Sequence, residues 1–473
     1  MKQWGLDLEA AKGLGDRLQS LWVRFQRQFQ TRTHDTSSYA YHYLSGLLRM
    51  ETKRSMANIA RQAQQSDQNI QHFISQSPWD WRGPLEQVQA EIQARPELQS
   101  GGMLLLDESA DEKAGAKTVG AGRQYNGRLG KVDMSQVGVF LSFVKGPFWS
   151  WIDGDLYLPQ HWFGDDYADA RAAVAVPEER PFQTKVELGL AMILALQARD
   201  FAFEAVACDS FYGQDDAFRD QLDAADIEYM ADIPSDRRVY LSKPEIGLPK
   251  NKRGKQATQP RVLSPQSYRI SDLRHHRDTV WHTLTLRPTE RGHLTADFAA
   301  RRVWVVRQDL TVKEEWLVIR RDSTGKCSYS LSNAAPQASL EDLAPRKCCR
   351  YFIERCNQDA KSDLGWDELQ ATKFRAWQHH LSLTILAAWF IAETKLDWQR
   401  DHAHDPELLE HYQVDVLPNL SMANVRELLR AALPLPQLTT EQAALLVIQH
   451  LDRRVRSRKS RLKRRISRSR AET

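Results

Sequence analysis

Two short apolar runs, each ending on an aspartate, constrain the fold of this chain more than any other feature. The first run, "GGMLLLDES", reaches Asp107, and the second, "FEAVACDS", reaches Asp209. Such runs predict buried strands, and the carboxyl ends of these strands form the ligand-binding edge of an open α/β sheet. A buried carboxylate is costly without a cation. The two acids therefore indicate either a shared site for a divalent metal or two caps of the turns that follow.

The segments around these runs predict a mixed α/β order. Two β-rich runs, at 137–146 and 147–159, follow the first acid and are joined by a Gly-Pro turn. A long apolar helix is predicted at 186–200, a second helix near 215–223 and a further strand at 227–234. Three antiparallel strands followed by helix, strand, helix and strand indicate an α/β core.

The core is predicted to be discontinuous in the sequence. Its two parts are assigned to residues 99–234 and 323–400. The intervening segment, 235–322, begins with polar, Pro-bearing loops and continues with three alternating strands, which predicts a β-rich insertion. Residues 401–473 are predicted to be a helical C-terminal region that ends in a basic tail.

The N-terminal region, residues 1–98, shows apolar residues at helical spacing and no strand-like alternation, so it is predicted to be an all-helical domain. Ser55–Ala63 and Asp67–Gln76 would form two short helices around a tight turn, with Lys53 and Arg54 at the entrance. This arrangement indicates either a DNA-binding helix-turn-helix or a helix pair that only packs.

The charge of the chain is concentrated in its tail. Residues 453–470 carry eleven Lys or Arg, among them Arg464 and Arg465, and no acid. Removing these eleven charges from the net charge of +4 leaves −7 for the remainder. A block of this kind indicates polyanion binding through counterion release, or else a solvated tail.

Several classes of protein are disfavoured by composition. The longest apolar run, at 381–392, is too short to cross a bilayer, and the first residues, "MKQWGLDLEA", lack a signal-peptide pattern. Five cysteines without CxxC spacing argue against a disulfide framework and a four-cysteine zinc site. We expect the side chains of three of these, Cys348, Cys349 and Cys356, to pack a helix against the rest of the protein. The chain is therefore predicted to be cytoplasmic, with no membrane partner.

The segment "CCRYFIERCNQDAK" (348–361) predicts a helix with one distinctive face. Glu354 and Lys361 are seven residues apart and share that face, and Arg350 lies one turn before Glu354. An acid framed by basic residues suits a metal ligand whose neighbours hold substrate phosphates. The same spacing also suits a surface helix with salt bridges between its turns.

These motifs carry a resemblance to a known family. "LLLDES", "ACDSFYG" and "RYFIERCNQDAK" resemble the three acidic motifs of the DDE transposases of the IS4-like superfamily, and most closely those of the IS701 family. The resemblance extends to 120–143, to 153–163, and to "KRSMANIA" and "IQHFISQSPWD" in the N-terminal region. It implies a ribonuclease H-like catalytic core, interrupted by a β-rich insertion, in which Asp107, Asp209 and Glu354 are the catalytic metal ligands.

The resemblance also implies a reaction. Two Mg²⁺ ions, for which Mn²⁺ can substitute, would support phosphoryl transfer at the terminal inverted repeats of an insertion sequence, followed by joining of the 3′-hydroxyl ends to target DNA. The implied partners are double-stranded DNA and a second copy of the chain, in a bacterial cytoplasm and on the nucleoid when bound. Two alternatives are a transposase-derived protein that binds terminal repeats without cutting, and a nuclease that cuts without joining.

The family signature around the third acid is Tyr, two residues, Arg, three residues, Glu, six residues, Lys. Arg350, Glu354 and Lys361 match it, whereas Lys347 stands at the Tyr position. Tyr351 lies close by, and Lys347 is expected to meet a phosphate in place of the tyrosine. The residues predicted to contact DNA are Arg350, Lys361, Lys347, Tyr351, Lys53, Arg54, Arg123, Arg464 and Arg465.

Deletion of residues 453–473 tests the predicted role of the tail. Because phosphate-bound Lys and Arg displace counterions, the shortened chain is expected to bind DNA more weakly and with a flatter salt dependence. The measurement is the slope of log binding constant against log salt concentration for both chains on one duplex. An unchanged slope would contradict a role of the tail in DNA binding.

Overall fold

The computed structural model describes most of the chain. The described residues are 8–249, 257–264, 266–289, 292–417, 419–435, 439–441, 444–445, 447–448, 451–452, 454–456, 458–460 and 463. Residues 1–432 form one compact unit and residues 433–473 form a second. Arg464 and Arg465, which were predicted to contact DNA, lie outside the described residues.

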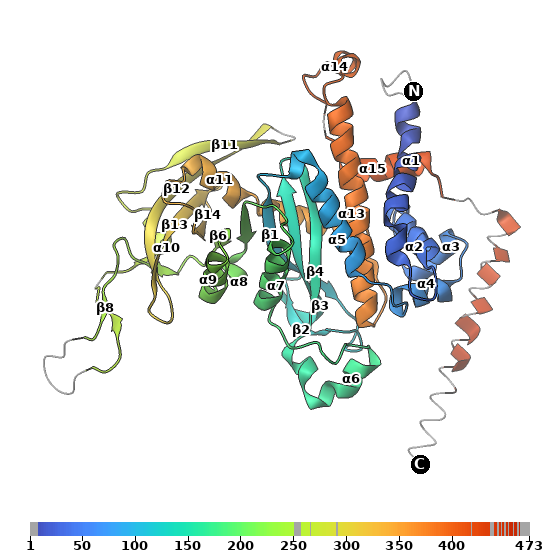
Figure 1. Ribbon diagram of the computed structural model, residues 1–473, viewed down its shortest axis with the longest axis horizontal. Helices are drawn as coiled ribbons and strands as arrows, with labels where there is room; N and C mark the ends of the chain where they lie inside the picture. Colours follow the sequence, from blue (N-terminus) through green and yellow to red (C-terminus); the bar gives the residue numbers. More distant parts are fainter. Residues whose placement is uncertain are drawn as a thin grey trace. The chain divides into compact units, whose positions relative to one another are not determined.

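The first unit is a mixed α/β structure built on one ten-stranded sheet (Figure 1). The strand order is β11-β12-β13-β14-β6-β5-β1-β3-β2, and β4 pairs with β3 off this path. The strands are β1 (Met103–Glu112), β2 (Gly122–Asn126), β3 (Lys131–Lys145), β4 (Phe148–Tyr157), β5 (Ala205–Cys208), β6 (Glu228–Asp232), β11 (His282–Thr289), β12 (Gly292–Val306), β13 (Val312–Arg321) and β14 (Cys327–Ser332). Two small ribbons pair β7 (Arg238–Val239) with β10 (Tyr268–Arg269) and β8 (Ile246–Gly247) with β9 (Arg261–Val262).

The helices cover this sheet and form the N-terminal region. They are α1 (Leu8–Phe25), α2 (Ser37–Arg49), α3 (Met56–Gln62), α4 (Asp67–Ser75), α5 (Arg82–Ala94), α6 (Ala168–Ala173), α7 (Lys185–Gln197), α8 (Ser210–Gly213), α9 (Asp216–Ala224), α10 (Ile270–Leu273), α11 (Leu340–Cys348), α12 (Tyr351–Gln358), α13 (Phe374–His402), α14 (Pro406–Tyr412) and α15 (Met422–Ala432). The predicted α/β order of strands and helices between residues 101 and 234 is present in the structure.

Three parallel strands form the centre of the sheet. β1 pairs in parallel with β5, and β5 pairs in parallel with β6, so that Leu105, Ala207 and Met230 lie level with one another. All three are buried in one cluster with Leu343 of α11 and Ile353 of α12. Because side chains alternate along a strand, every second residue of these strands faces α11 and α12.

The opposite face of the parallel strands is covered by α7. This helix begins with a capping box, in which Thr184 accepts a hydrogen bond from the Glu187 amide while the Glu187 carboxylate accepts one from the Thr184 amide. Gly189 of α7 lies against Leu106, and a Cβ added there would come within 2.5 Å of Leu106 Cδ2. The missing side chain therefore allows α7 to approach the sheet closely.

The apolar run at 381–392 lies in the middle of α13 and is buried. α13 packs against β4 and against α2, α4 and α5, and Figure 1 shows α13 and α5 beside β4. The run is therefore the buried middle of α13, and α13 joins the N-terminal helices to the sheet. Among the described helices, none has the length and the apolar character that crossing a membrane requires.

The predicted insertion continues the core sheet. β14 pairs antiparallel with β6 on one side and with β13 on the other, so β11, β12 and β13 extend the same sheet (Figure 1). One face of these strands packs against Ile270 and Leu273 of α10, and the other packs against α11. The insertion is thus fixed to the parallel strands by backbone hydrogen bonds as well as by apolar contacts.

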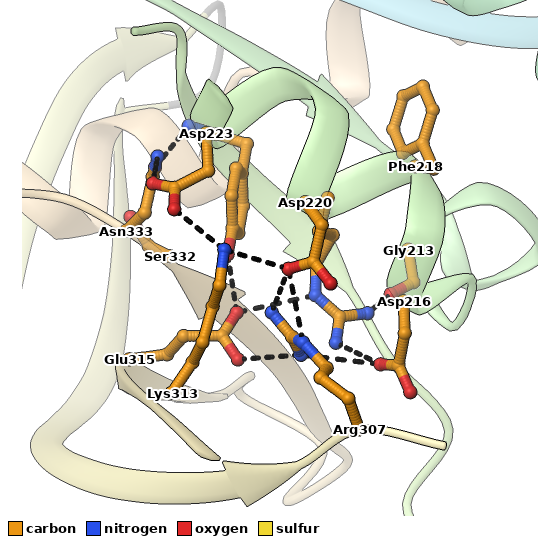
Figure 2. Close-up of polar contacts among 12 residues, drawn as sticks. Gly213, Asp216, Phe218, Asp220, Asp223, Arg307, Lys313, Glu315, Ser332 and Asn333 are labelled. Atoms are coloured by element: carbon orange, nitrogen blue, oxygen red, sulfur yellow. Dashed lines mark hydrogen bonds and ion pairs between the residues drawn. The ribbon is translucent and has the colours of Figure 1, made fainter. Parts of the chain in front are cut away.

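A buried charge network fastens β12 and β13 to α9 (Figure 2). Glu315 is 1% exposed and accepts hydrogen bonds from Arg219 Nε (3.3 Å), Arg307 Nη1 (3.1 Å) and the Tyr229 hydroxyl (2.5 Å). Arg307 also reaches Asp220 Oδ1 at 3.0 Å. Two buried guanidinium groups therefore share one buried carboxylate between the core and the insertion.

Glu315→Ala is expected to lower the free energy of unfolding by about 3 kcal/mol, because it removes the most buried carboxylate that Arg219 and Arg307 share and leaves them only the more exposed Asp216 and Asp220. Chemical denaturation measures the change. The matched control is Glu314→Ala, since Glu314 has a side chain 36% exposed and pairs with Arg302 at 3.1 Å; its loss should be under about 1 kcal/mol. Equal losses for the two variants would contradict this account of the network.

Candidate active site

Three aspartates lie level with one another at the carboxyl end of the parallel pairing between β1, β5 and β6. Asp107, Asp209 and Asp232 each follow by two residues the buried side chains that pair across β1, β5 and β6. Because alternate residues share a face, the three positions are on the side covered by α11 and α12. Asp107 and Asp209 were predicted here from sequence. Asp232 was not predicted, although it ends the run "IEYMAD" (227–232) in the same way as the other two acids end theirs.

Asp107 differs in one respect from the prediction that it ends a strand. β1 continues to Glu112, because β3 pairs with it along its whole length. Only the parallel pairing with β5 ends beforehand, at Leu106 and Cys208. Asp107 therefore lies where the parallel pairing stops, on a backbone that β3 still holds in an extended conformation.

Asp209 is the N-cap of α8. Its Oδ1 accepts hydrogen bonds from the amides of Phe211 (2.9 Å) and Tyr212 (3.4 Å). Asp209 therefore caps the turn that follows its strand, as one of the two sequence-based interpretations predicted. These hydrogen bonds also fix the direction of the carboxylate.

The edge of the sheet carries an excess of negative charge. Burial, with repulsion from Asp209 and Glu108, raises the pKa of Asp107 to about 7, and Arg350 opposes the shift. Burial and Glu108 also raise the pKa of Asp209, against the backbone hydrogen bonds from Tyr212 and Phe211 and the charge of Arg350. The ionised forms of both acids are thus destabilised where they stand.

The predicted single helix around Glu354 is interrupted. α11 ends at Cys348 and α12 begins at Tyr351, with a turn at Cys349 and Arg350 between them. After Gln358 the chain continues as a π-helical segment, Asp359–Asp363. The α-helical spacing of 100° per residue does not hold past that point, so the common face of Glu354 and Lys361 inferred from that spacing stays a prediction.

Arg350 lies between the acids. Its Nε is 3.3 Å from Asp232 Oδ2, its Nη1 is 3.9 Å from Asp107 Oδ2 and its Nη2 is 3.7 Å from Glu354 Oε1. The Glu354 side chain is 64% exposed, whereas that of Asp107 is 18% exposed. One guanidinium thus gathers acids from β1, β6 and α12.

The donor set suits a hard divalent cation, since it consists of carboxylates in a site with excess negative charge. Asp107 and Asp209 fit such an ion by chemistry and placement. Glu354 is near but faces Arg350. In the described part of the chain, no three His, Cys, Asp or Glu side chains are close enough together to hold a metal ion.

Three predicted DNA contacts are placed differently by the structure. Arg54 is 2% exposed, and its guanidinium binds Glu368 and the carbonyl oxygens of Met50 and Glu51. Lys347 is 6% exposed, with its Nζ at Asp232 and Ser330. Lys361 is half-buried and bonds to Asp111 Oδ1 and the Ala110 carbonyl, both at 2.9 Å. These three cations are engaged in ion pairs and hydrogen bonds within the protein, and their contact with DNA stays a prediction.

Three other residues predicted to contact DNA, Tyr351, Arg123 and Lys53, lie at the surface. Tyr351 is exposed on α12, and the Arg287 guanidinium lies 4.9 Å from its ring centroid. Arg123 on β2 and Lys53 before α3 are also exposed. α3 and α4 are present near their predicted positions, 55–63 and 67–76.

The cysteines of this region pack in the protein interior. Cys348 and Cys356 are buried and Cys349 is half-buried, and all three are free thiols. Burial raises the pKa of the Cys356 thiol to about 12, which disfavours the thiolate that a zinc site would need. The expectation of helix packing for these residues agrees with their burial.

A comparison with protein families decides the membership of the chain. Residues 24–293 match a family model described as DDE superfamily endonuclease. The chain belongs to the DDE superfamily of endonucleases. The match in this DDE endonuclease contains β1, β5 and β6 with their three aspartates, and it ends before α12. The predicted family is thus confirmed.

One curated relative of this DDE endonuclease has a name that describes its activity. It is a probable transposase for insertion sequence element IS701 from Microchaete diplosiphon. The two chains are 25% identical over 326 residues, which cover 65% of this chain and 70% of the relative.

Asp107→Asn tests the excess charge through stability in metal-free buffer. A carboxyl whose pKa is raised in the folded state makes folding less favourable as pH rises from its unfolded-state pKa to its folded-state pKa. The variant is therefore expected to gain stability over the wild type between pH 4 and about 7, by a few kcal/mol at most. Denaturation across this pH range measures the difference. The exposed Asp166→Asn serves as control, and a difference independent of pH for Asp107→Asn would contradict the account.

Proposed function

We propose that this DDE endonuclease is a transposase that cleaves the terminal inverted repeats of an insertion sequence and joins the 3′-hydroxyl ends to target DNA. The observation that supports the proposal is the placement of Asp107 and Asp209 level at the carboxyl end of the parallel pairing between their strands, with Arg350 within 4.0 Å of both Asp107 and Glu354 of α12. The similarity to a probable IS701 transposase supports the same conclusion.

The topology supports a ribonuclease H-like core. β4, β3 and β1 are antiparallel neighbours, and β5 and β6 continue from β1 in parallel. α7 connects β4 to β5, and α9 connects β5 to β6. A β-rich insertion then precedes the helix that carries Glu354, in the order expected for this family.

We assign Asp107, Asp209 and Glu354 as the residues that would hold Mg²⁺, or Mn²⁺ in its place. When bound, such ions would activate the attacking hydroxyl and stabilise the leaving oxygen. The N-cap bonds of Asp209 and the β3 pairing of Asp107 hold two ligands rigidly, whereas Glu354 is exposed and able to change rotamer. Arg350, half-buried between Asp107 and Glu354, would orient a phosphate through its guanidinium.

The proposed partner is double-stranded DNA, bound by a homodimer so that both ends are processed together. Tyr351, Arg123 and Lys53 are exposed and suited to contact it. The tail with Arg464 and Arg465 would add charge-driven binding. A bacterial cytoplasm, with association to the nucleoid on binding, is the proposed location.

The proposal is tested with linear DNA that carries the sequences flanking this gene. Wild type is expected to cut at the element ends only with Mg²⁺ or Mn²⁺ present. Because the metal supplies several kcal/mol of charge stabilisation, Asp107→Ala and Asp209→Ala should lower the cleavage rate on the order of a thousandfold. Asp166→Ala, at an exposed position, is the control.

Three outcomes separate the related activities. Joining of labelled ends to supercoiled target supports a transposase. Cutting without joining would leave only a nuclease. Binding of the ends with no cutting by wild type would overturn the proposed catalysis in favour of a transposase-derived DNA-binding protein.

A further inference from the structure

Asp232, at the end of β6, uses both of its carboxylate oxygens. Oδ1 accepts hydrogen bonds from Ser330 Oγ at 2.5 Å and from Lys347 Nζ at 3.2 Å. Oδ2 faces Arg350 Nε at 3.3 Å. Asp232 is thus bound on one side to buried groups and on the other side to the cation that lies between the candidate acids.

The buried side of this arrangement is rigid. Ser330 lies directly opposite Asp232 in the β14–β6 pairing, and Lys347 Nζ donates to Ser330 Oγ at 2.6 Å. The Lys347 side chain is 2% exposed. A buried ammonium is costly without an anion, and Asp232 supplies that anion. Lys347, which stands where the resembling family has a tyrosine, is therefore the counter-ion of Asp232.

The other side of Asp232 determines where Arg350 lies. Arg350 occupies the turn between α11 and α12 and has three acids around it. Asp232 is the nearest at 3.3 Å, against 3.7 Å for Glu354 and 3.9 Å for Asp107. Without Asp232, the described anions that remain within 4.0 Å of this guanidinium are Asp107 and Glu354, two of the three candidate metal ligands.

We propose that Asp232 is a positioning residue that draws the Arg350 guanidinium away from direct pairing with Asp107 and Glu354. Lys347 and Ser330 hold Asp232 in place for this role. The inference rests on the proposed function in one respect, that Asp107 is a ligand of divalent metal. Its consequence is that Asp232 keeps the acids accessible to the metal without binding the metal itself.

The test is a titration of the full chain with Mn²⁺ in the absence of DNA, in which the EPR signal of free Mn²⁺ measures how much ion is bound. In Asp232→Asn, Arg350 should pair with Asp107 and Glu354 and compete with the ion, so the dissociation constant should rise about tenfold, equivalent to about 1.4 kcal/mol of competing interaction. In an Arg350→Gln background the competitor is absent, so adding Asp232→Asn should change Mn²⁺ binding less than twofold. This dependence on Arg350 is a readout that a merely structural role would not give.

A second variant separates positioning from folding. Asp232→Asn leaves Lys347 buried without its anion, which by itself destabilises the fold. Asp232→Asn combined with Lys347→Met removes that buried charge, so the unfolding midpoint should recover towards wild type while the weakened Mn²⁺ binding persists. Recovery of Mn²⁺ binding together with stability would overturn the inference.

The remaining outcomes also decide. An equal loss of Mn²⁺ affinity from Asp232→Asn with and without Arg350 would mean that Asp232 does not act through Arg350, which overturns the inference. Unchanged binding in Asp232→Asn, with binding abolished in Asp107→Ala, would overturn the inference and leave the proposed function standing. Unchanged binding in Asp107→Ala as well would overturn the proposed function and the inference with it.

Discussion

The register of three parallel strands is the constraint on which the candidate site depends. Leu105, Ala207 and Met230 lie level across β1, β5 and β6, and their burial against α11 and α12 fixes which face of each strand points that way. A shift of one residue in any strand would turn its acid to the other face. The apolar core therefore determines where the charged chemistry is placed, two residues further along each strand.

The acids at this edge differ in how well their charge is compensated. Asp111 has Lys361 at 2.9 Å, Glu108 has Lys185 at 3.0 Å and Asp232 has Lys347 at 3.2 Å. Asp107 has Arg350 no nearer than 3.9 Å, and its pKa is raised to about 7. The basic residues around the site thus pair individually with Asp111, Glu108 and Asp232, whereas Asp107 and Asp209 carry charge that a divalent cation would balance.

Periodicity in the sequence predicted the elements and the two strand-associated acids, because strand runs and helix patterns are local properties. It did not predict the roles of Arg54, Lys347 and Lys361, whose burial depends on Glu368, Asp232 and Asp111. These partners come from segments that are distant in the sequence and that the fold brings together. The break at Cys349 and the π-helical segment after Gln358 were likewise not predicted from periodicity. Asp232 ends a strand run in the same way as Asp107 and Asp209, and the pairing of β6 level with β5 shows that it lies beside them.

The central claim is that Asp107 and Asp209 together hold a divalent cation at the edge of the parallel strands. Anomalous diffraction from crystals of the full chain grown with Mn²⁺ tests it most directly. The account predicts a manganese peak in direct coordination with carboxylate oxygens of both residues, and its loss in Asp209→Asn. A manganese peak at another position, or no peak at this edge in crystals with Mn²⁺ bound elsewhere, would contradict the account.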